Sequence, residues 1–157
     1  MKKIAVLFCC SFVFLILSGT CFAEPSKVTS PITDPATAHE MFAEAMNNRD
    51  VEALCAMYAD DAVLVLRNGG MIVRGKDNIR KVFTKMTKVI QKLTLETVYA
   101  VKSGDTMLFR SKYHSVFTAP HGDTVEVLCS GVEVLKEQPD GTWKFIIDHH
   151  AGGENLL

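Results

Sequence analysis

The spacing of hydrophobic residues changes along this chain from a helical to a strand period, and this change constrains the fold more than any other feature. In residues 34–58 and 76–90, apolar residues recur every three or four positions, as on one face of a helix. From residue 93 onward they alternate, and turn-forming Gly, Pro and Asp residues separate the segments. Helices followed by a run of antiparallel strands predict an α+β domain, with three N-terminal helices on one face of a sheet.

The ends of these elements carry recognisable signals. Asp34-Pro35 places an oxygen cap before a proline at the first helical position, and Asp50 caps a second, shorter helix that closes near Tyr58. A third helix is expected from about Lys76 to Ile90. The expected strands are a short hairpin around 62–66 and 71–73, followed by longer strands at 93–102, 106–119, 124–137 and 143–150.

The first 23 residues have the pattern of a secretory signal peptide. Met1-Lys2-Lys3 is followed by an apolar run that is too short for a comfortable membrane span, and cleavage is expected after Ala23. Lipidation at Cys21 fits less well, because Thr20 stands where a small Ala or Gly is usual. The expected organisation is therefore a signal peptide at 1–23, a flexible lead-in at 24–33, a domain at 34–152 and a tail at 153–157, in a secreted or periplasmic protein without a transmembrane segment in the mature chain.

Charge and motif content exclude several classes of function. With 17 Lys and Arg against 18 Asp and Glu, the net charge is −1, which argues against a nucleic-acid binder. The basic stretch from Arg74 to Lys92 is interpreted as a solvated helix face, or alternatively as a contact for an anionic lipid or an acidic partner. Scattered histidines and the lack of a phosphate-binding loop indicate neither a metal site nor a cofactor. The mature chain keeps Cys55 and Cys129, which are interpreted as two buried free thiols rather than a disulfide.

Strand alternation predicts the two faces of the sheet. If Phe117 pairs with Val125, then Ser115 meets Val127, Tyr113 meets Cys129 and Phe109 meets Glu133. That face mixes aromatic and polar side chains, as the lining of a cavity does. The other face is rich in aliphatic residues and is expected to form a homodimer contact, although a bulge would exchange the faces: Leu108, Val116, Leu128, Val132 and Val134.

Two segments resemble a known superfamily. Asn47–Phe83 contains a short helix, Tyr-Ala-Asp-Asp-Ala, a strand, a turn, and Gly before the next helix, and it resembles the opening of nuclear-transport-factor-2-like (NTF2-like) domains. Gly141–Gly152, GTWKFIIDHHAG, is similar to their last strand, above all in the SnoaL-like and DUF4440 (SgcJ/EcaC-type) branches and in the association domain of calcium/calmodulin-dependent kinase II. The resemblance implies a cone-shaped half barrel, a pocket open at one end, and dimers formed through the sheet; it does not imply one function.

The same resemblance argues against one familiar activity. In ketosteroid isomerases of this superfamily, an Asp base and a Tyr donor move the proton and polarise the carbonyl group. Alignment without gaps places Leu66 and Phe42 at those two positions, and neither side chain can do this chemistry. Glu133 falls near the third catalytic position, which is a protonated acid. Ketosteroid isomerisation is therefore not expected, and whether the protein is an enzyme stays open.

The remaining candidates for chemistry lie in the last strands. His149 shares a strand face with Trp143, Phe145 and Ile147, so it is expected to point into the pocket as a general base. Glu133 and Tyr113 are its candidate catalytic partners. The alternatives are a rim or core histidine, a solvated Glu133 and a Tyr58 that only packs. The expected ligand-binding residues are Phe42, Tyr58, Phe109, Tyr113, Cys129, Trp143 and His149.

Three functions fit these features. The first is an exported protein that binds a small, mostly apolar molecule. The second is a cyclase, isomerase or dehydratase that uses general acid–base catalysis, and the third is an oligomeric association domain.

Overall fold

The computed structural model describes residues 30–67 and 70–153. The expected signal peptide, most of the lead-in and the last four residues of the tail lie outside the described residues. Within the described part of the chain, no helix is long and apolar enough to cross a membrane.

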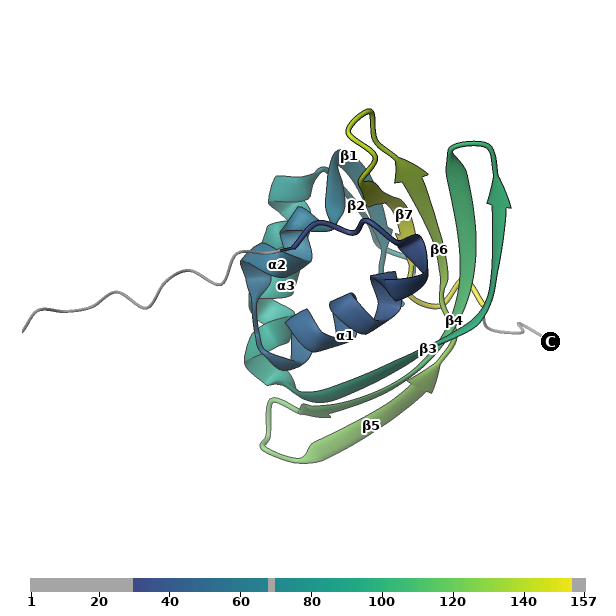
Figure 1. Cartoon of the computed structure of the whole chain (residues 1–157). Helices are drawn as coiled ribbons and strands as arrows, with labels where there is room; N and C mark the ends of the chain where they lie inside the picture. Colours follow the sequence, from purple (N-terminus) through teal and green to yellow (C-terminus); the bar gives the residue numbers. More distant parts are fainter. Residues whose placement is uncertain (1–29, 68–69, 154–157) are drawn as a thin grey trace, which may run out of the picture.

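A curved sheet wraps around the helices (Figure 1), as the α+β cone requires. Its strand order is β2-β1-β7-β6-β4-β3, and β5 pairs with the part of β4 that extends beyond β6. All pairs are antiparallel except β1 with β7. The helical elements are η1 (Pro35–Thr37), α1 (Ala38–Asn47), α2 (Val51–Ala56) and α3 (Lys76–Val89). The strands are β1 (Tyr58–Val65), β2 (Ile72–Arg74), β3 (Ile90–Ser103), β4 (Thr106–Thr118), β5 (Thr124–Cys129), β6 (Val132–Glu137) and β7 (Trp143–His149).

Both predicted helix caps are present. The Asp34 carboxylate accepts a hydrogen bond from the Ala36 backbone N–H at 3.0 Å, and that of Asp50 accepts one from Ala53 at 2.9 Å. The second helix is shorter than expected, since it ends at Ala56. Tyr58, expected to close that helix, instead begins β1.

The predicted register of the sheet is confirmed. Tyr113 pairs with Cys129, Ser115 with Val127, and Phe117 with Val125; Phe109 pairs with Glu133. The strand expected at 124–137 divides into β5 and β6 at residues 130–131. The pairing with β4 keeps the same register on both sides of this break, because Gly131 and Ser111 exchange backbone hydrogen bonds of 3.0 and 3.2 Å.

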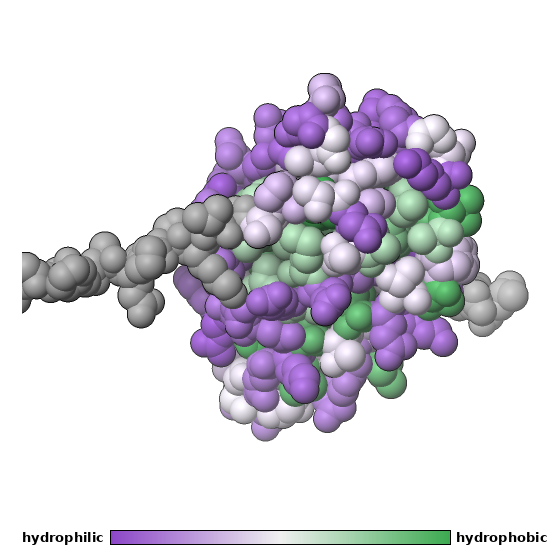
Figure 2. All heavy atoms as spheres, viewed as in Figure 1, coloured by the Kyte–Doolittle hydropathy of each residue, from purple (hydrophilic) through white to green (hydrophobic). Residues whose placement is uncertain are grey.

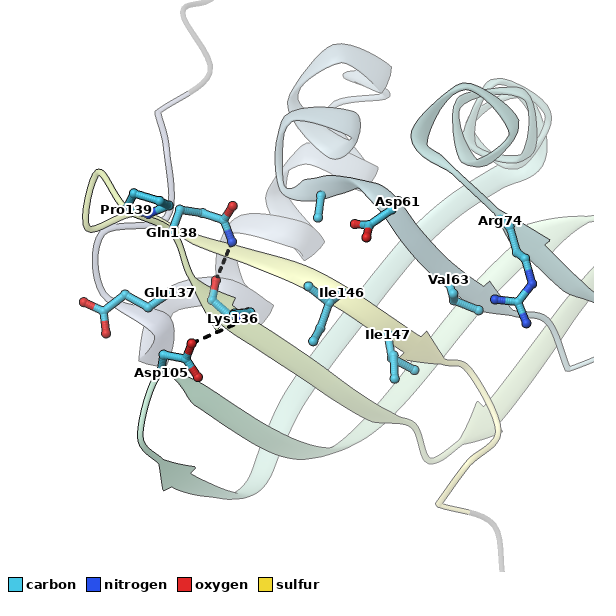
Figure 3. Close-up of a pocket in the computed structure, with 11 residues that line it drawn as sticks. Asp61, Val63, Arg74, Asp105, Lys136, Glu137, Gln138, Pro139, Ile146 and Ile147 are labelled. Atoms are coloured by element: carbon cyan, nitrogen blue, oxygen red, sulfur yellow. Dashed lines mark hydrogen bonds and ion pairs between the residues drawn. The ribbon is translucent and has the colours of Figure 1, made fainter.

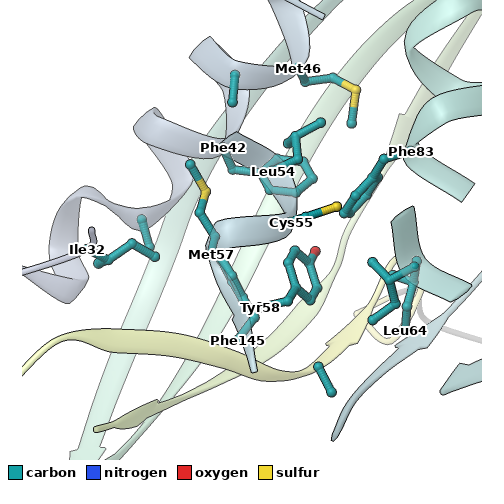
Figure 4. Close-up of a cluster of buried hydrophobic side chains, with 14 of the residues drawn as sticks. Ile32, Phe42, Met46, Leu54, Cys55, Met57, Tyr58, Leu64, Phe83 and Phe145 are labelled. Carbon is teal, nitrogen blue, oxygen red and sulfur yellow. The ribbon is translucent and has the colours of Figure 1, made fainter. Parts of the chain in front are cut away.

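Aromatic and aliphatic side chains fill the core between the helices and the sheet (Figure 4). The Tyr58 ring stacks on Phe145 with 5.2 Å between the ring centroids and meets Phe83 edge-on at 5.3 Å. Both described cysteines, Cys55 and Cys129, are buried thiols outside any disulfide, as expected. The hydrophobic side chains of this core therefore fill one part of the interior of the cone.

A bulge in β7 changes which of its side chains face inward. Val134 pairs with Ile147, but the next residue of β6, Leu135, pairs with Phe145, so Ile146 is an extra residue in β7. Phe145 and Asp148 are buried, whereas Ile147 is 43% exposed. The alternation that begins at Trp143 is thus shifted by one position before it reaches His149.

Candidate functional site

A cavity of about 450 Å³ lies between α1, α3 and the inner face of the sheet. This volume lies within the range of small-molecule sites. Most of its wall is apolar: Phe42, Met46, Leu66, Val82, Met86, Val89, Ile90, Leu93, Leu95, Phe117, Val127 and Phe145. The polar lining residues are His39, Arg67, Tyr113, Ser115, Glu133, Asp148 and His150.

Two carboxyl groups and two imidazole rings meet in this lining. Glu133 and Asp148 are cross-strand partners on β6 and β7, which places their side chains next to each other. His150 follows at the end of β7, and His39 comes from α1. Acidic and basic groups from three elements therefore converge on one cavity.

Asp148 and His150 form an ion pair within this cluster. His150 Nε2 lies 3.6 Å from Asp148 Oδ2, and the buried Tyr58 hydroxyl donates a hydrogen bond to the same oxygen. Burial alone would raise the pKa of Asp148, but the charge of His150 and the Tyr58 hydrogen bond outweigh it and lower that pKa. For His150, burial lowers the pKa, yet Asp148 and Glu133 raise it above its usual value. The surroundings thus favour a charged pair.

His39 and Glu133 form a second pair with different hydrogen bonding. His39 Nδ1 lies 2.7 Å from the Thr97 hydroxyl oxygen, and the Ser111 hydroxyl donates to Glu133 Oε1 at 2.6 Å. The remaining atoms, His39 Nε2 and Glu133 Oε2, are 3.4 Å apart, within ion-pair distance. Neither makes a hydrogen bond to any other described residue.

Three of the expected site residues line the cavity: Phe42, Tyr113 and Glu133. Burial raises the pKa of Tyr113 far above its usual value, and the neighbouring Cys129 raises it further, so the phenol keeps its proton. Leu66, which stands at the position of the isomerase base, also lines the cavity. The roles proposed for these residues stay predictions.

His149 does not line the cavity, and the expectation that it points inward is wrong. The bulge at Ile146 shifts the alternation of β7, so Asp148 and His150 face the cavity in place of His149. The His149 ring instead packs against Gly152, where an added Cβ would lie 2.9 Å from the ring, and its Nδ1 accepts a hydrogen bond from the Ala151 N–H at 3.3 Å.

Four expected ligand contacts also lie outside the lining. Tyr58 is fully buried behind the lining, where it contacts the lining residues Asp148 and Phe145. Phe109 packs behind the His39 ring, with 5.1 Å between centroids, and Trp143 is covered by Lys102 and bridged to Ile32. Cys129 lines a separate recess together with Tyr113. None of these four side chains forms part of the cavity wall.

The sequence carries a signal for His39, although His39 is not among the site residues expected from it. His39 precedes Phe42 by three residues and Met46 by seven, so it lies on the helix face that carries the apolar stripe. Because the helical period is read from apolar residues, a histidine on the same face does not stand out. No equivalent signal marks the bulge that brings Asp148 and His150 inward.

A larger groove of about 1020 Å³ lies on the outside of the sheet (Figure 3). Val63, Ile146 and Ile147 form its apolar part, and charged side chains such as Asp61 and Arg74 surround them. It is open, and its lining contains none of the buried titratable residues. Among the described residues, no group of three or more His, Cys, Asp or Glu could hold a metal ion. The inner cavity is therefore the candidate site.

Comparison with solved structures identifies the fold. A ketosteroid isomerase-like protein from Erwinia carotovora atroseptica superposes with a TM-score of 0.67 at 22% identity, covering 76% of this chain and 93% of its own. A provisionally assigned dehydratase of the NTF2-like family from Streptomyces avermitilis gives 0.62 at 19% identity, with coverage of 76% and 93%. A provisionally assigned calcium/calmodulin-dependent protein kinase II association domain from Thiobacillus denitrificans gives 0.64 at 15% identity, with coverage of 78% and 97%.

Sequence comparison gives the family. No curated protein matches the chain. The family model of the SnoaL-like domain matches residues 38–145, which include α1, α3 and most of the strands that surround the cavity. The chain belongs to the SnoaL-like family, within the NTF2-like superfamily.

Proposed function

We propose that this protein binds a small, mostly apolar molecule in the inner cavity. The observation that carries the proposal is a cavity of about 450 Å³ with aliphatic and aromatic walls and one buried polar cluster. Apolar walls supply most of the binding free energy at such sites, and a few polar groups orient the ligand. The fold agrees with this proposal, but hosts other functions as well.

The test places a bulky side chain in the cavity from strand β5. Val127 lines the cavity, whereas the neighbouring Glu126 points outward and is exposed. Val127→Trp should weaken binding of the neutral apolar probe N-phenyl-1-naphthylamine at least about tenfold, because the indole occupies the ligand volume. Glu126→Trp, the matched control, should change its affinity less than about twofold. Failure of the wild-type protein to bind the probe, together with the lack of a co-purifying compound in native mass spectrometry, would contradict the proposal.

A second candidate is an enzyme that uses general acid–base catalysis. The observation that favours it is the Asp148–His150 pair beside Glu133. The raised pKa of His150 suits a proton donor, and the Glu133 carboxyl group lies where a proton acceptor is needed. Deuterium incorporation from D₂O into 2-tetralone, followed by mass spectrometry, would report such proton transfer. The enzyme proposal requires that the wild type accelerates the exchange, that His150→Gln abolishes the acceleration, and that His149→Gln preserves it.

Two further properties are also proposals. The first is export after cleavage near Ala23, which N-terminal sequencing of the mature protein tests. The second is a homodimer formed through the outer face of the sheet. Several aliphatic side chains remain exposed on that face, including Leu108 and Ile147.

A further inference from the structure

Building on the proposed binding function, we propose that His39 and Glu133 together bind a hydroxyl group of the ligand. The ligand class is then an apolar molecule that carries an alcohol or a phenol at its buried end.

The proposal rests on two buried polar atoms that make no hydrogen bond. His39 is 3% exposed and Glu133 is 6% exposed, and both line the cavity. Within the described residues, His39 Nε2 and Glu133 Oε2 are the buried side-chain nitrogen and oxygen atoms that lack a hydrogen-bond partner. Buried polar groups are otherwise almost always satisfied, so these two atoms indicate a missing partner in the cavity.

The geometry of the pair suits a single oxygen atom. The two atoms are 3.4 Å apart, so one oxygen can lie at about 2.8 Å from both of them. If the Thr97 hydroxyl donates to His39 Nδ1, the ring carries its proton on Nε2. The ligand oxygen then accepts from Nε2–H, and the ligand O–H donates to Glu133 Oε2. A hydroxyl group thus satisfies both atoms.

The other common head groups fit less well. A carboxylate would lie beside the carboxyl groups of Glu133 and Asp148, which are cross-strand neighbours. An ammonium group has no acceptor for Nε2–H. An ether or ketone oxygen can accept from His39 but leaves Glu133 Oε2 without a donor. The apolar residues that make up the rest of the lining require a hydrocarbon body.

The experiment compares two ligands of similar shape. 2-Naphthol and 2-methylnaphthalene differ in a hydroxyl group against a methyl group, and isothermal titration measures their affinities for the wild-type protein. We expect 2-naphthol to bind at least about tenfold more tightly, because only its hydroxyl satisfies the buried pair. Equal affinity would show that solvent satisfies the pair and would overturn the hydroxyl proposal, while the binding function stands.

Variants test the two side chains directly. Glu133→Gln keeps the size of the side chain and its bond to Ser111, but removes the free carboxylate acceptor, so the preference for 2-naphthol should fall to about twofold or less. His39→Leu should reduce the same ratio without loss of 2-methylnaphthalene binding. Glu126→Gln, the same change at an exposed position, should preserve the wild-type ratio. A ratio that survives both Glu133→Gln and His39→Leu contradicts the proposal.

The outcomes separate this proposal from the function on which it rests. If N-phenyl-1-naphthylamine binds but the two naphthalenes show no preference, only the hydroxyl subsite is wrong. If none of the three compounds binds and no compound co-purifies in native mass spectrometry, the binding function itself is wrong.

Discussion

The burial of Asp148 is possible because two side chains, Tyr58 and His150, stabilise its charge. Asp148 is 5% exposed, and burial of an unpaired carboxylate costs several kcal/mol. Tyr58 donates to it from below, and His150 lies 3.6 Å away on the cavity side. The Tyr58 hydroxyl stays protonated, because burial and the adjacent Asp148 raise its pKa. This phenol therefore acts as a fixed donor beneath the cavity floor.

The first prediction concerns that donor. Tyr58→Phe keeps the ring contacts with Phe83 and Phe145 but removes the hydrogen bond to a charged group. The free energy of unfolding at pH 6, measured by urea denaturation, should fall by about 1.5–3 kcal/mol. Tyr99→Phe, at a ring that is 50% exposed, is the control and should leave it nearly unchanged. A neutral Tyr58→Phe would mean that Asp148 does not depend on this bond.

The second prediction concerns pH. The lowered pKa of Asp148 makes a contribution to stability that is present above its unfolded value of about 4 and is lost as the pH falls. The raised pKa of His150 makes one that is present below about 6.5 and is lost as the pH rises through its folded value. The stability difference between wild type and His150→Gln should therefore be largest between about pH 4 and 6.5. Urea denaturation across pH 3–9 measures it, and a difference that keeps growing above pH 8 would contradict this assignment.

At the scale of elements, local sequence predicts register better than it predicts irregularity. The turn at 120–123 sets the pairing of β4 with β5, so the neighbours of Tyr113 and Phe117 follow from simple alternation. The bulge at Ile146 has no comparable signal, since neither Gly nor Pro marks it. The position of Glu133 was therefore predictable, whereas the exchange of His149 for Asp148 and His150 was not. The position of such an extra residue depends on the curvature of the whole sheet, because a bulge bends the strand that carries it.

The third prediction concerns the junction of β5 and β6. A Cβ at Gly131 would lie 2.2 Å from Glu133 Oε1 and 2.7 Å from Ser111 Oγ. Gly131→Ala should therefore displace the Glu133 carboxyl group, break its bond to Ser111, and lower the free energy of unfolding by about 1–3 kcal/mol. Ser130→Ala, at the half-buried neighbour, is the matched control. An alanine tolerated without loss would mean that the strands shift apart at this break without cost.

The surface of the whole molecule carries both hydrophilic and hydrophobic regions. In the view of Figure 2, hydrophilic residues occupy much of the periphery, and paler hydrophobic residues gather in the middle. The outer face of the sheet carries an aliphatic row that follows the cross-strand pairs from β1 to β3 in turn: Val63, Ile147, Val134, Leu108 and Val101. Leu108, Ile147 and Val101 are 37%, 43% and 57% exposed. Such a continuous row is typical of a face that another protein surface covers.

A second copy of this chain is the occupant that the row suits best, because a twofold axis across the sheet would place the row against itself. We expect light scattering at micromolar concentration to give the mass of a dimer. Leu108→Asp should dissociate it, since two carboxylates would be buried near the axis without partners. Met71→Asp, at a residue that is 59% exposed outside the row, should leave the dimer intact. A wild-type monomer would rule out the self-association, and a dimer that survives both Leu108→Asp and Ile147→Asp would place the interface on another surface.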